Sequence, residues 1–347
     1  MAKSYYKICV LPGDGIGPEV TAEAIKVLRA TGLEFEFLIR EVGGSSYLKN
    51  GDSFPKEARE ACEMADAVLF GAVGHDYAPY DIPRRVLDYL RREKDTYVNL
   101  RPMKLYPKIE CPLKLPEGRG IDVVVVRENT EGESVKQSGV VGDRVGSDMR
   151  IITRFGSQRL IRFAFEYARS HRRRKVTCVD MSQLLSGDKL FREVFDEVAE
   201  WYPDIEKDYR AVDVAAMHLV SNIESFDIIV TSNLYGDVLS GILCGLIGGV
   251  GMAPSACIGD RFAYFEPVHG TAWDIAGKGI ANPIAEILSA KLMLEWLREE
   301  EAAENIEQAV TMILEEGKVR TPDIGGTSTT SEVGDAIARK VEELSKR

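Results

Sequence analysis

The strongest restriction on the fold is a regular alternation between short apolar runs of strand length and longer segments with one apolar face. The strand-like runs are residues 7–11, 35–39, 67–70, 121–127, 149–154, 175–179 and 227–231. The helix-length segments begin at Pro18 and continue at residues 82–94, 158–170, 189–200, 213–220, 283–299 and 304–316. This pattern is typical of an α/β protein whose strands are covered on both faces. No strand-like run separates the last two segments, so we expect them to pack back on the first part of the chain.

Composition and charge narrow the class of protein. With 347 residues and 45% hydrophobic content, the chain can bury a large core in one or two compact domains. Its formal net charge of −11 argues against a nucleic-acid backbone or an anionic membrane as the main partner. Nothing at the start resembles a secretory signal and no apolar run has membrane-spanning length, so we expect a cytosolic protein. The six cysteines have neither disulfide density nor metal-site spacing, and we expect them to be small buried hydrophobes.

A glycine-rich segment, residues 13–17, follows the first strand-like run and precedes a helix-length segment. A dinucleotide fingerprint would lie in this place with the spacing G-x-G-x-x-G. The segment reads G-x-G-x-G instead, with Asp14 inside it and Pro18 after it. It therefore does not predict a Rossmann fold, and both a tight turn and a ligand contact stay open for it.

Three arginines, Arg91, Arg101 and Arg127, lie near predicted domain junctions. The planar fork of a guanidinium matches a carboxylate in a bidentate manner. Arg127 directly follows a run of buried-type valines, where a charge needs a partner or a ligand. Surface charge explains Arg84 and Arg92 well.

Two aspartates are candidate metal ligands. Asp213 begins an apolar helix-length segment, and Asp237 comes just after the strand-like run 227–231. The ends of strands in α/β sheets are where ligands bind, and two carboxylates with substrate oxygens suit Mg²⁺ or Mn²⁺. Helix capping is the alternative explanation for either aspartate.

A long segment, residues 265–283, shows no helix or strand pattern and contains His269, one of only four histidines. Loops of this length are functional or disordered, and the apolar and glycine content of this one opposes disorder. The segment resembles the NAD-binding loop of the isopropylmalate and isocitrate dehydrogenase family, the β-decarboxylating dehydrogenases. Further segments resemble family motifs in the family order, so that the resemblance covers essentially the whole chain; they are residues 11–19, 99–102, 127–132, 233–237 and 321–326.

The resemblance implies a two-domain α/β fold that is not a Rossmann fold. The first, NAD-binding domain would comprise residues 1–98 and 250–347, so that both chain ends form it. Residues 99–249 would form the second domain, which carries the dimer interface and the metal site. Family members are dimers or larger, and each active site borrows residues from the neighbouring subunit.

The resemblance also implies roles for the candidate residues. Arg91, Arg101 and Arg127 would clamp the malate part of a 2-hydroxy acid, while Asp237 and Asp213 of a second chain would hold Mg²⁺ or Mn²⁺. The cradle for the adenosine half of NAD would be His269, Gly270, Thr271, Ala272, Asp274 and Asn282. An acid at position 274 accepts the ribose hydroxyls and favours NAD over NADP. Trp273 stands where the family usually has a proline.

Several residues of the family reaction are missing. Ser134 occupies the place of the expected tyrosine, Met181 that of the lysine, and Gly241 that of a further acidic metal ligand. General acid or base assistance is worth roughly 10² to 10⁴ in rate, so we expect a strongly slowed family reaction. Lys136 and Lys189 are nearby in the sequence and are possible substitutes.

Two hypotheses follow. The first is an NAD- and metal-dependent dehydrogenase that oxidatively decarboxylates a 3-substituted malate, with 3-isopropylmalate as the leading substrate and D-malate or tartrate as the alternative. The positions of Leu87 and Asp88 face the variable substituent in the family, and an acidic Asp88 disfavours an extra substrate carboxylate. The second hypothesis is a catalytically impaired, ligand-binding or regulatory subunit that supports an active paralogue in a hetero-oligomer rather than a homodimer.

Overall fold

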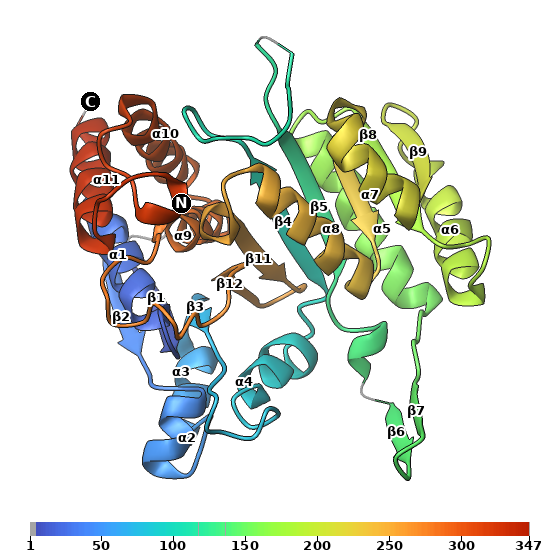
Figure 1. Ribbon diagram of the computed structural model, residues 1–347, viewed down its shortest axis with the longest axis horizontal. Helices are drawn as coiled ribbons and strands as arrows, with labels where there is room; N and C mark the ends of the chain where they lie inside the picture. Colours follow the sequence, from blue (N-terminus) through green and yellow to red (C-terminus); the bar gives the residue numbers. More distant parts are fainter. Residues whose placement is uncertain (1–4, 117, 136, 347) are drawn as a thin grey trace.

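The computed structural model describes residues 5–116, 118–135 and 137–346 and confirms the α/β class. Its centre is a ten-stranded sheet with the order β2-β1-β3-β12-β11-β4-β5-β10-β8-β9 (Figure 1). The strands are β1 (Tyr6–Gly13), β2 (Phe35–Ile39), β3 (Ala67–Ala72), β4 (Val98–Lys104), β5 (Asp122–Glu128), β8 (Lys175–Asp180), β9 (Glu206–Ala211), β10 (Ile228–Thr231), β11 (Pro254–Ile258) and β12 (Ala263–Pro267). Two further strands, β6 (Ser138–Val141) and β7 (Val145–Asp148), form a hairpin that projects away from the sheet (Figure 1).

Helices cover both faces of the sheet (Figure 1). They are α1 (Gly17–Ala30), α2 (Gly44–Asn50), α3 (Lys56–Met64), α4 (Arg85–Asp88), α5 (Arg154–Ser170), α6 (Ser186–Ala199), α7 (Val212–Ser221), α8 (Asn233–Leu246), α9 (Ile284–Trp296), α10 (Glu300–Glu316) and α11 (Thr330–Ser345). Both α9 and α11 pack against α1, and α10 packs against α9 and α11. The two chain ends therefore share one part of the molecule, as expected for the late helices, whereas the domain limits at 98/99 and 249/250 stay a prediction.

The middle of the sheet differs from its two sides. The strands β5, β10, β8 and β9 run parallel, as do β2, β1, β3 and β12. Between these blocks, β4 is antiparallel to both β5 and β11, and β11 is antiparallel to β12. Purely parallel strands are buried on both faces, and the four valines at 123–126 are accordingly at most 2% exposed. The central strands thus join two separately covered blocks.

The strand predicted at residues 149–154 is wrong. Only one isolated bridge forms there, between Ile151 and Gly132, and α5 already begins at Arg154. The Thr153 hydroxyl caps the helix by accepting a hydrogen bond from the Gly156 N–H at 3.0 Å, which favours a helix start over strand extension. The helix predicted at 82–94 begins only at Arg85 and continues as a π-helical turn, Tyr89–Glu93.

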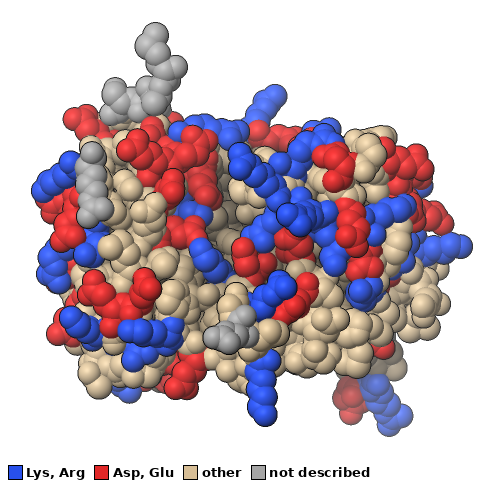
Figure 2. Space-filling model, turned by 90° about the horizontal axis from the view of Figure 1, so that it is seen from above, with Lys and Arg blue, Asp and Glu red and all other residues tan. Residues whose placement is uncertain are grey.

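The surface and the cysteines agree with the composition. Acidic and basic side chains both occur across the face seen in Figure 2, and acidic ones gather near its upper left. Among the described residues, no helix combines the length and the apolarity needed to cross a bilayer. Five of the six cysteines are buried, as predicted, and Cys111 is half-buried.

Candidate active site

A cavity of about 550 Å³ opens near the ends of the central strands. Most of the predicted binding residues meet at its wall, although they come from distant parts of the chain. Of the sequence candidates, the lining contains Leu87 but not Asp88, and it further contains Arg91, Arg101, Arg127, Ser134, Asp237, His269 and Gly270. Asp213 is not among the lining residues; it lies exposed in the first turn of α7.

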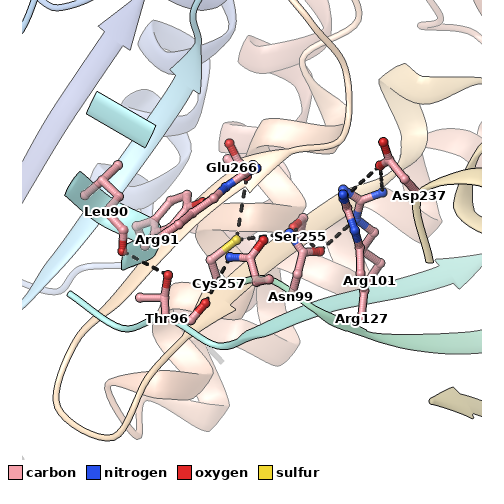
Figure 3. A network of polar contacts seen from close by, with 12 residues as sticks. Leu90, Arg91, Thr96, Asn99, Arg101, Arg127, Asp237, Ser255, Cys257 and Glu266 are labelled. Carbon is pink, nitrogen blue, oxygen red and sulfur yellow. Dashed lines mark hydrogen bonds and ion pairs between the residues drawn. The ribbon is translucent and has the colours of Figure 1, made fainter. Parts of the chain in front are cut away.

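Two buried arginines converge on one carboxylate (Figure 3). The Nη1 atoms of Arg101 and Arg127 donate to the same oxygen of Asp237, at 3.0 and 2.8 Å. The Asn233 backbone and side-chain oxygens accept two further hydrogen bonds from Arg127, at 2.8 and 2.9 Å. Asn233 and Asp237 belong to the first turns of α8, which follows β10 directly, and this short connection brings the helix start to the ends of β4 and β5.

The electrostatics of this group favour an anion. Burial and the neighbouring Arg101 lower the pKa of Arg127 to about 9, so the guanidinium still carries its charge at neutral pH. Burial alone would raise the pKa of Asp237, but Arg127 and Arg101 together hold it below its ordinary value. Two cations thus face one carboxylate that is more than half exposed at the cavity. A negatively charged ligand would relieve the repulsion between the arginines.

Arg91 is held separately. Its Nε atom donates to the Tyr264 hydroxyl at 2.9 Å, and its Nη2 atom lies 3.1 Å from an oxygen of Glu266. No role for Glu266 is predicted from the sequence, in which it lies near the start of the segment 265–283. Arg84 is exposed, as predicted, but it also lines the cavity with Tyr80, and its guanidinium lies 4.2 Å from the Tyr80 ring centroid.

The long loop between β12 and α9 presents two buried polar side chains. The His269 Nδ1 atom donates to the Gly270 carbonyl at 2.9 Å, while the buried Nε2 atom has no partner among the described residues. Burial lowers the pKa of His269, so the neutral ring leaves Nε2 free to accept a hydrogen bond. Asn282 is held by Asp323 and by the Ile284 N–H, each at 3.0 Å. Asp274 is exposed.

The glycine-rich segment, residues 13–17, contacts the backbone of this loop. Asp14 is buried, and its carboxylate accepts hydrogen bonds from the N–H groups of Gly44, Ser45 and Gly74, at 2.7, 2.8 and 2.9 Å. A Cβ atom at Gly15 would lie 1.9 Å from the Thr271 carbonyl oxygen, so only glycine permits this approach. The segment therefore acts as a structural turn that joins neighbouring loops.

Trp273 is turned away from the arginines. Its indole N–H donates to the Gly74 carbonyl at 2.8 Å, and its ring meets His75 edge-on at 4.5 Å. The side chain instead lines a different cavity, of about 410 Å³, together with the glycine-rich segment and α2.

Of the positions of the missing catalytic residues, Ser134 lines the arginine cavity, whereas Met181 lines another one, of about 130 Å³. The Ser134 hydroxyl donates to the Glu131 carbonyl at 2.7 Å, and Met181 is held through its backbone N–H by Asp188 at 2.8 Å. A Cβ atom at Gly241, one turn after Asp237 on α8, would meet nothing within 4 Å. Lys189 is exposed, and Lys136 lies outside the described residues.

Metal ligands are correspondingly sparse. Within the described ranges, no group of three or more His, Cys, Asp or Glu side chains is arranged to hold a metal ion. Three carboxylates line this cavity, and Glu133 and Glu266 are already paired with Arg150 and Arg91, while Asp237 is paired with Arg101 and Arg127.

Fold and site together define an α/β protein with an arginine-rich cavity that is also lined by buried His269 of the long loop. Residues 7–337 match the model of the isocitrate/isopropylmalate dehydrogenase family, and the chain belongs to this family. It is 44% identical to the 3-isopropylmalate/3-methylmalate dehydrogenase of Methanocaldococcus jannaschii, over 97% of this chain and 99% of the relative. It is also 43% identical to the homoisocitrate dehydrogenase of the same organism, over 98% and 99%. The crystal structure of isocitrate dehydrogenase from Methylococcus capsulatus superposes with a TM-score of 0.90 at 37% identity, over 97% of this chain and 99% of that one.

Proposed function

We propose that this protein is an NAD- and divalent-metal-dependent dehydrogenase that oxidatively decarboxylates a 3-substituted malate, with 3-isopropylmalate as the first candidate substrate. The observation that carries the proposal is the meeting of Arg91, Arg101 and Arg127 at one cavity. In this role the three guanidiniums bind the two carboxylates of the substrate and orient its hydroxyl-bearing carbon. They also stabilise negative charge that develops on the hydroxyl oxygen as it becomes a carbonyl.

The loop after β12 fits the adenosine half of NAD. The unpartnered Nε2 atom of buried His269 is an acceptor suited to an amino group. Asn282, at the end of the same loop, is also buried. Gly270, Thr271 and Ala272 would bring the backbone to the ligand, and exposed Asp274 is free to accept ribose hydroxyls. When bound, NAD accepts the hydride from the hydroxyl-bearing carbon.

A metal site fits only when two copies of the chain are combined. One Asp237 oxygen binds both arginines, and the other has no hydrogen bond to a described residue. The exposed Asp213 is available to a second copy, and a bound Mg²⁺ or Mn²⁺ would polarise the substrate hydroxyl. Apolar side chains that are about half exposed on α7 and α8 support a homodimer through these helices; they are Met217, Val220, Leu234 and Val238.

A second function is supported by the absent catalytic groups. With Ser134, Met181 and Gly241 at the expected acid, base and metal positions, the chain keeps the residues for binding and lacks those for proton transfer. Such a protein would bind the dicarboxylate and NAD and regulate an active paralogue in a hetero-oligomer. D-malate or tartrate remains the alternative substrate if the cavity does not accept a branched substituent.

The test is an assay of the purified chain alone. NADH absorbance is followed with Mg²⁺ or Mn²⁺ against 3-isopropylmalate, D-malate, tartrate and isocitrate, and binding of NAD and of each acid is measured by calorimetry. Turnover on a malate derivative supports the dehydrogenase and identifies its substrate. Binding without turnover contradicts the dehydrogenase and supports the regulatory subunit, and the absence of both contradicts the two functions together.

A further inference from the structure

Polar side chains interrupt the apolar interior at the centre of the ten-stranded sheet. Glu266 on β12 pairs in register with Ser255 on β11, and Cys257 on β11 pairs with Asn99 on β4. All four residues are at most 8% exposed. The Ser255 hydroxyl donates to Asn99 Oδ1 at 3.2 Å. Because burying polar groups costs free energy unless they are hydrogen-bonded, a polar row at this depth needs a reason beyond packing.

This row connects the two groups of arginines (Figure 3). Asn99 Oδ1 accepts from Arg101 Nε at 2.7 Å, and Asn99 Nδ2 donates to the Cys257 sulfur at 3.1 Å. On its other side, the Cys257 thiol lies 3.6 Å from the Glu266 oxygen that contacts Arg91. Burial raises the pKa of Cys257 to about 12, so the thiol keeps its proton and can donate it toward Glu266. A continuous chain of side chains therefore runs from Arg91 to Arg101.

We propose that Asn99 and Cys257 are positioning residues that set the separation between Arg91 and Arg101, and thereby the ligand length that the cavity accepts. The proposal rests on the proposed function only in assuming that these arginines bind a dicarboxylate, and it does not require turnover.

The geometry gives the physical reason. Arg101 is held at two points, by Asn99 at Nε and by Asp237 at Nη1, which fixes the plane of its guanidinium before a ligand arrives. Side chains that are already ordered lose less entropy on binding. A ligand with two carboxylates needs the arginine groups at a fixed separation, whereas a ligand with one carboxylate does not.

The experiment compares D-malate, with two carboxylates, and D-lactate, with one, by calorimetry. The variants are Asn99→Ala, Cys257→Ala and Cys257→Ser, and the matched control is Cys244→Ala, which removes another buried thiol. We expect Asn99→Ala to weaken D-malate binding by about ten- to a hundredfold, since a hydrogen bond to a charged group is lost. Cys257→Ala should weaken it by about three- to tenfold, and Cys257→Ser should restore it. D-lactate binding should change by less than about threefold in every variant.

A second readout is independent of any ligand. In arginine-labelled protein, the Arg101 Nε–H resonance should exchange slowly with solvent, and its exchange should become at least about tenfold faster in Asn99→Ala. Equal losses for both acids, a loss in Cys244→Ala as large as in Cys257→Ala, or unchanged exchange in Asn99→Ala overturns the positioning role. If the unaltered protein binds no D-malate while the exchange still accelerates in Asn99→Ala, the proposed function fails and the positioning of Arg101 stands.

Discussion

The two sides of the cavity differ in how firmly their side chains are held. On the arginine side, Arg101 and Arg127 are at most 6% exposed, and they are bonded to Asn99 of β4 and to α8. On the catalytic side, the Ser134 hydroxyl bonds to its own turn, and Gly241, which is not among the lining residues, has open space beside it. Residues that hold the ligand are therefore also part of the packing of the sheet, while the expected catalytic positions are not. A change on the catalytic side should therefore cost the fold less free energy than a change among the arginines.

The largest effect should come from restoring the absent proton-transfer groups. The combined substitutions Met181→Lys and Ser134→Tyr should raise kcat by roughly 10² to 10⁴, because the lysine and the tyrosine supply the base and acid that the family resemblance implies. The measurement is NADH formation at saturating NAD, metal and 3-isopropylmalate or D-malate. Met149→Lys, at an exposed methionine, serves as the control. An unchanged rate in a double variant that still binds the acid would show that more than these two groups is missing.

Removing an arginine should damage both binding and folding. Arg127→Ala deletes hydrogen bonds to Asn233 and Asp237, and we expect the free energy of unfolding to fall by about 2–4 kcal/mol. D-malate binding should weaken at least about a hundredfold. Urea unfolding and calorimetry measure the two effects. The control Arg162→Ala removes a 59%-exposed guanidinium and should change the free energy of unfolding by no more than about 0.5 kcal/mol. An equal loss of stability in both variants would contradict the difference between the arginine side and the catalytic side.

Glu286 contrasts with the buried arginines, because its buried side chain has no hydrogen-bond partner among the described residues. It is fully buried on α9. Burial, reinforced by Glu266, raises its pKa well above the ordinary value, so the folded chain keeps this proton to a higher pH than the unfolded chain does. The folded state thus holds one more proton, and its stability falls as pH rises above the unfolded pKa, by up to about 1.4 kcal/mol per pH unit.

Glu286→Met should remove this dependence. We expect the variant to gain about 1–3 kcal/mol in the free energy of unfolding at pH 7, and to lose the fall in stability that Glu286 contributes as pH rises above its unfolded pKa. Urea unfolding at several pH values measures both. Glu301→Met, at an exposed position of α10, is the control. An unstabilised Glu286→Met with an unchanged slope would mean that the carboxyl has a partner that satisfies it.

A metal ligand should be restorable at small cost to the fold. Gly241→Asp places a carboxylate one turn after Asp237, in open space, and we expect about tenfold tighter Mn²⁺ binding by calorimetry. Stability should change by no more than about 0.5 kcal/mol. Gly245→Asp is the matched control, because a Cβ atom there also meets nothing but lies one turn farther along α8. Equal gains in both variants would indicate nonspecific attraction of the cation.

The smallest effect concerns the substrate substituent. Arg84 lines the cavity and forms no ion pair with a described acidic residue, so it should attract an additional carboxylate. Arg84→Gln should weaken tricarballylate binding relative to D-malate by about three- to tenfold, or ~1 kcal/mol. Arg85→Gln, an adjacent exposed arginine outside the lining, should not change this ratio. The result discriminates between a branched apolar substituent and an acidic one.

The sequence predicts strands best where valine and isoleucine dominate, as in β5, β8 and β10. It does not predict β11, whose small and proline-containing segment acquires strand geometry from pairing with β4 and β12. The interpretation of residues 149–154 fails because the Thr153 cap decides the conformation locally. Local pattern therefore identifies elements with their own propensity and misses those that depend on neighbours.

The same limit applies to the site. Arg91, Arg101, Arg127 and Asp237 are predicted from motifs, and all four line one cavity. The residues of the polar row behind them are distant in sequence: Cys257 lies 158 residues from Asn99. A helix pattern also does not reveal which exposed residue lines a cavity, so that the surface position of Arg84 is predicted and its place in the cavity is not. The domain limits, the homodimer, the cytosolic location and the roles of the cofactor and metal residues stay predictions.

The packing of α11 against α1 has a consequence for synthesis on the ribosome. Strands β1 to β3 emerge first, but α9 and α11, which pack against β3 or α1, and α10, which packs against α9 and α11, are translated last. The segment from β4 to α8 contains most of its own neighbours in one continuous stretch and can collapse earlier. The nascent N-terminal strands therefore expose apolar surface until the last helices are translated. We expect chaperones that hold unfolded chains to bind during this interval.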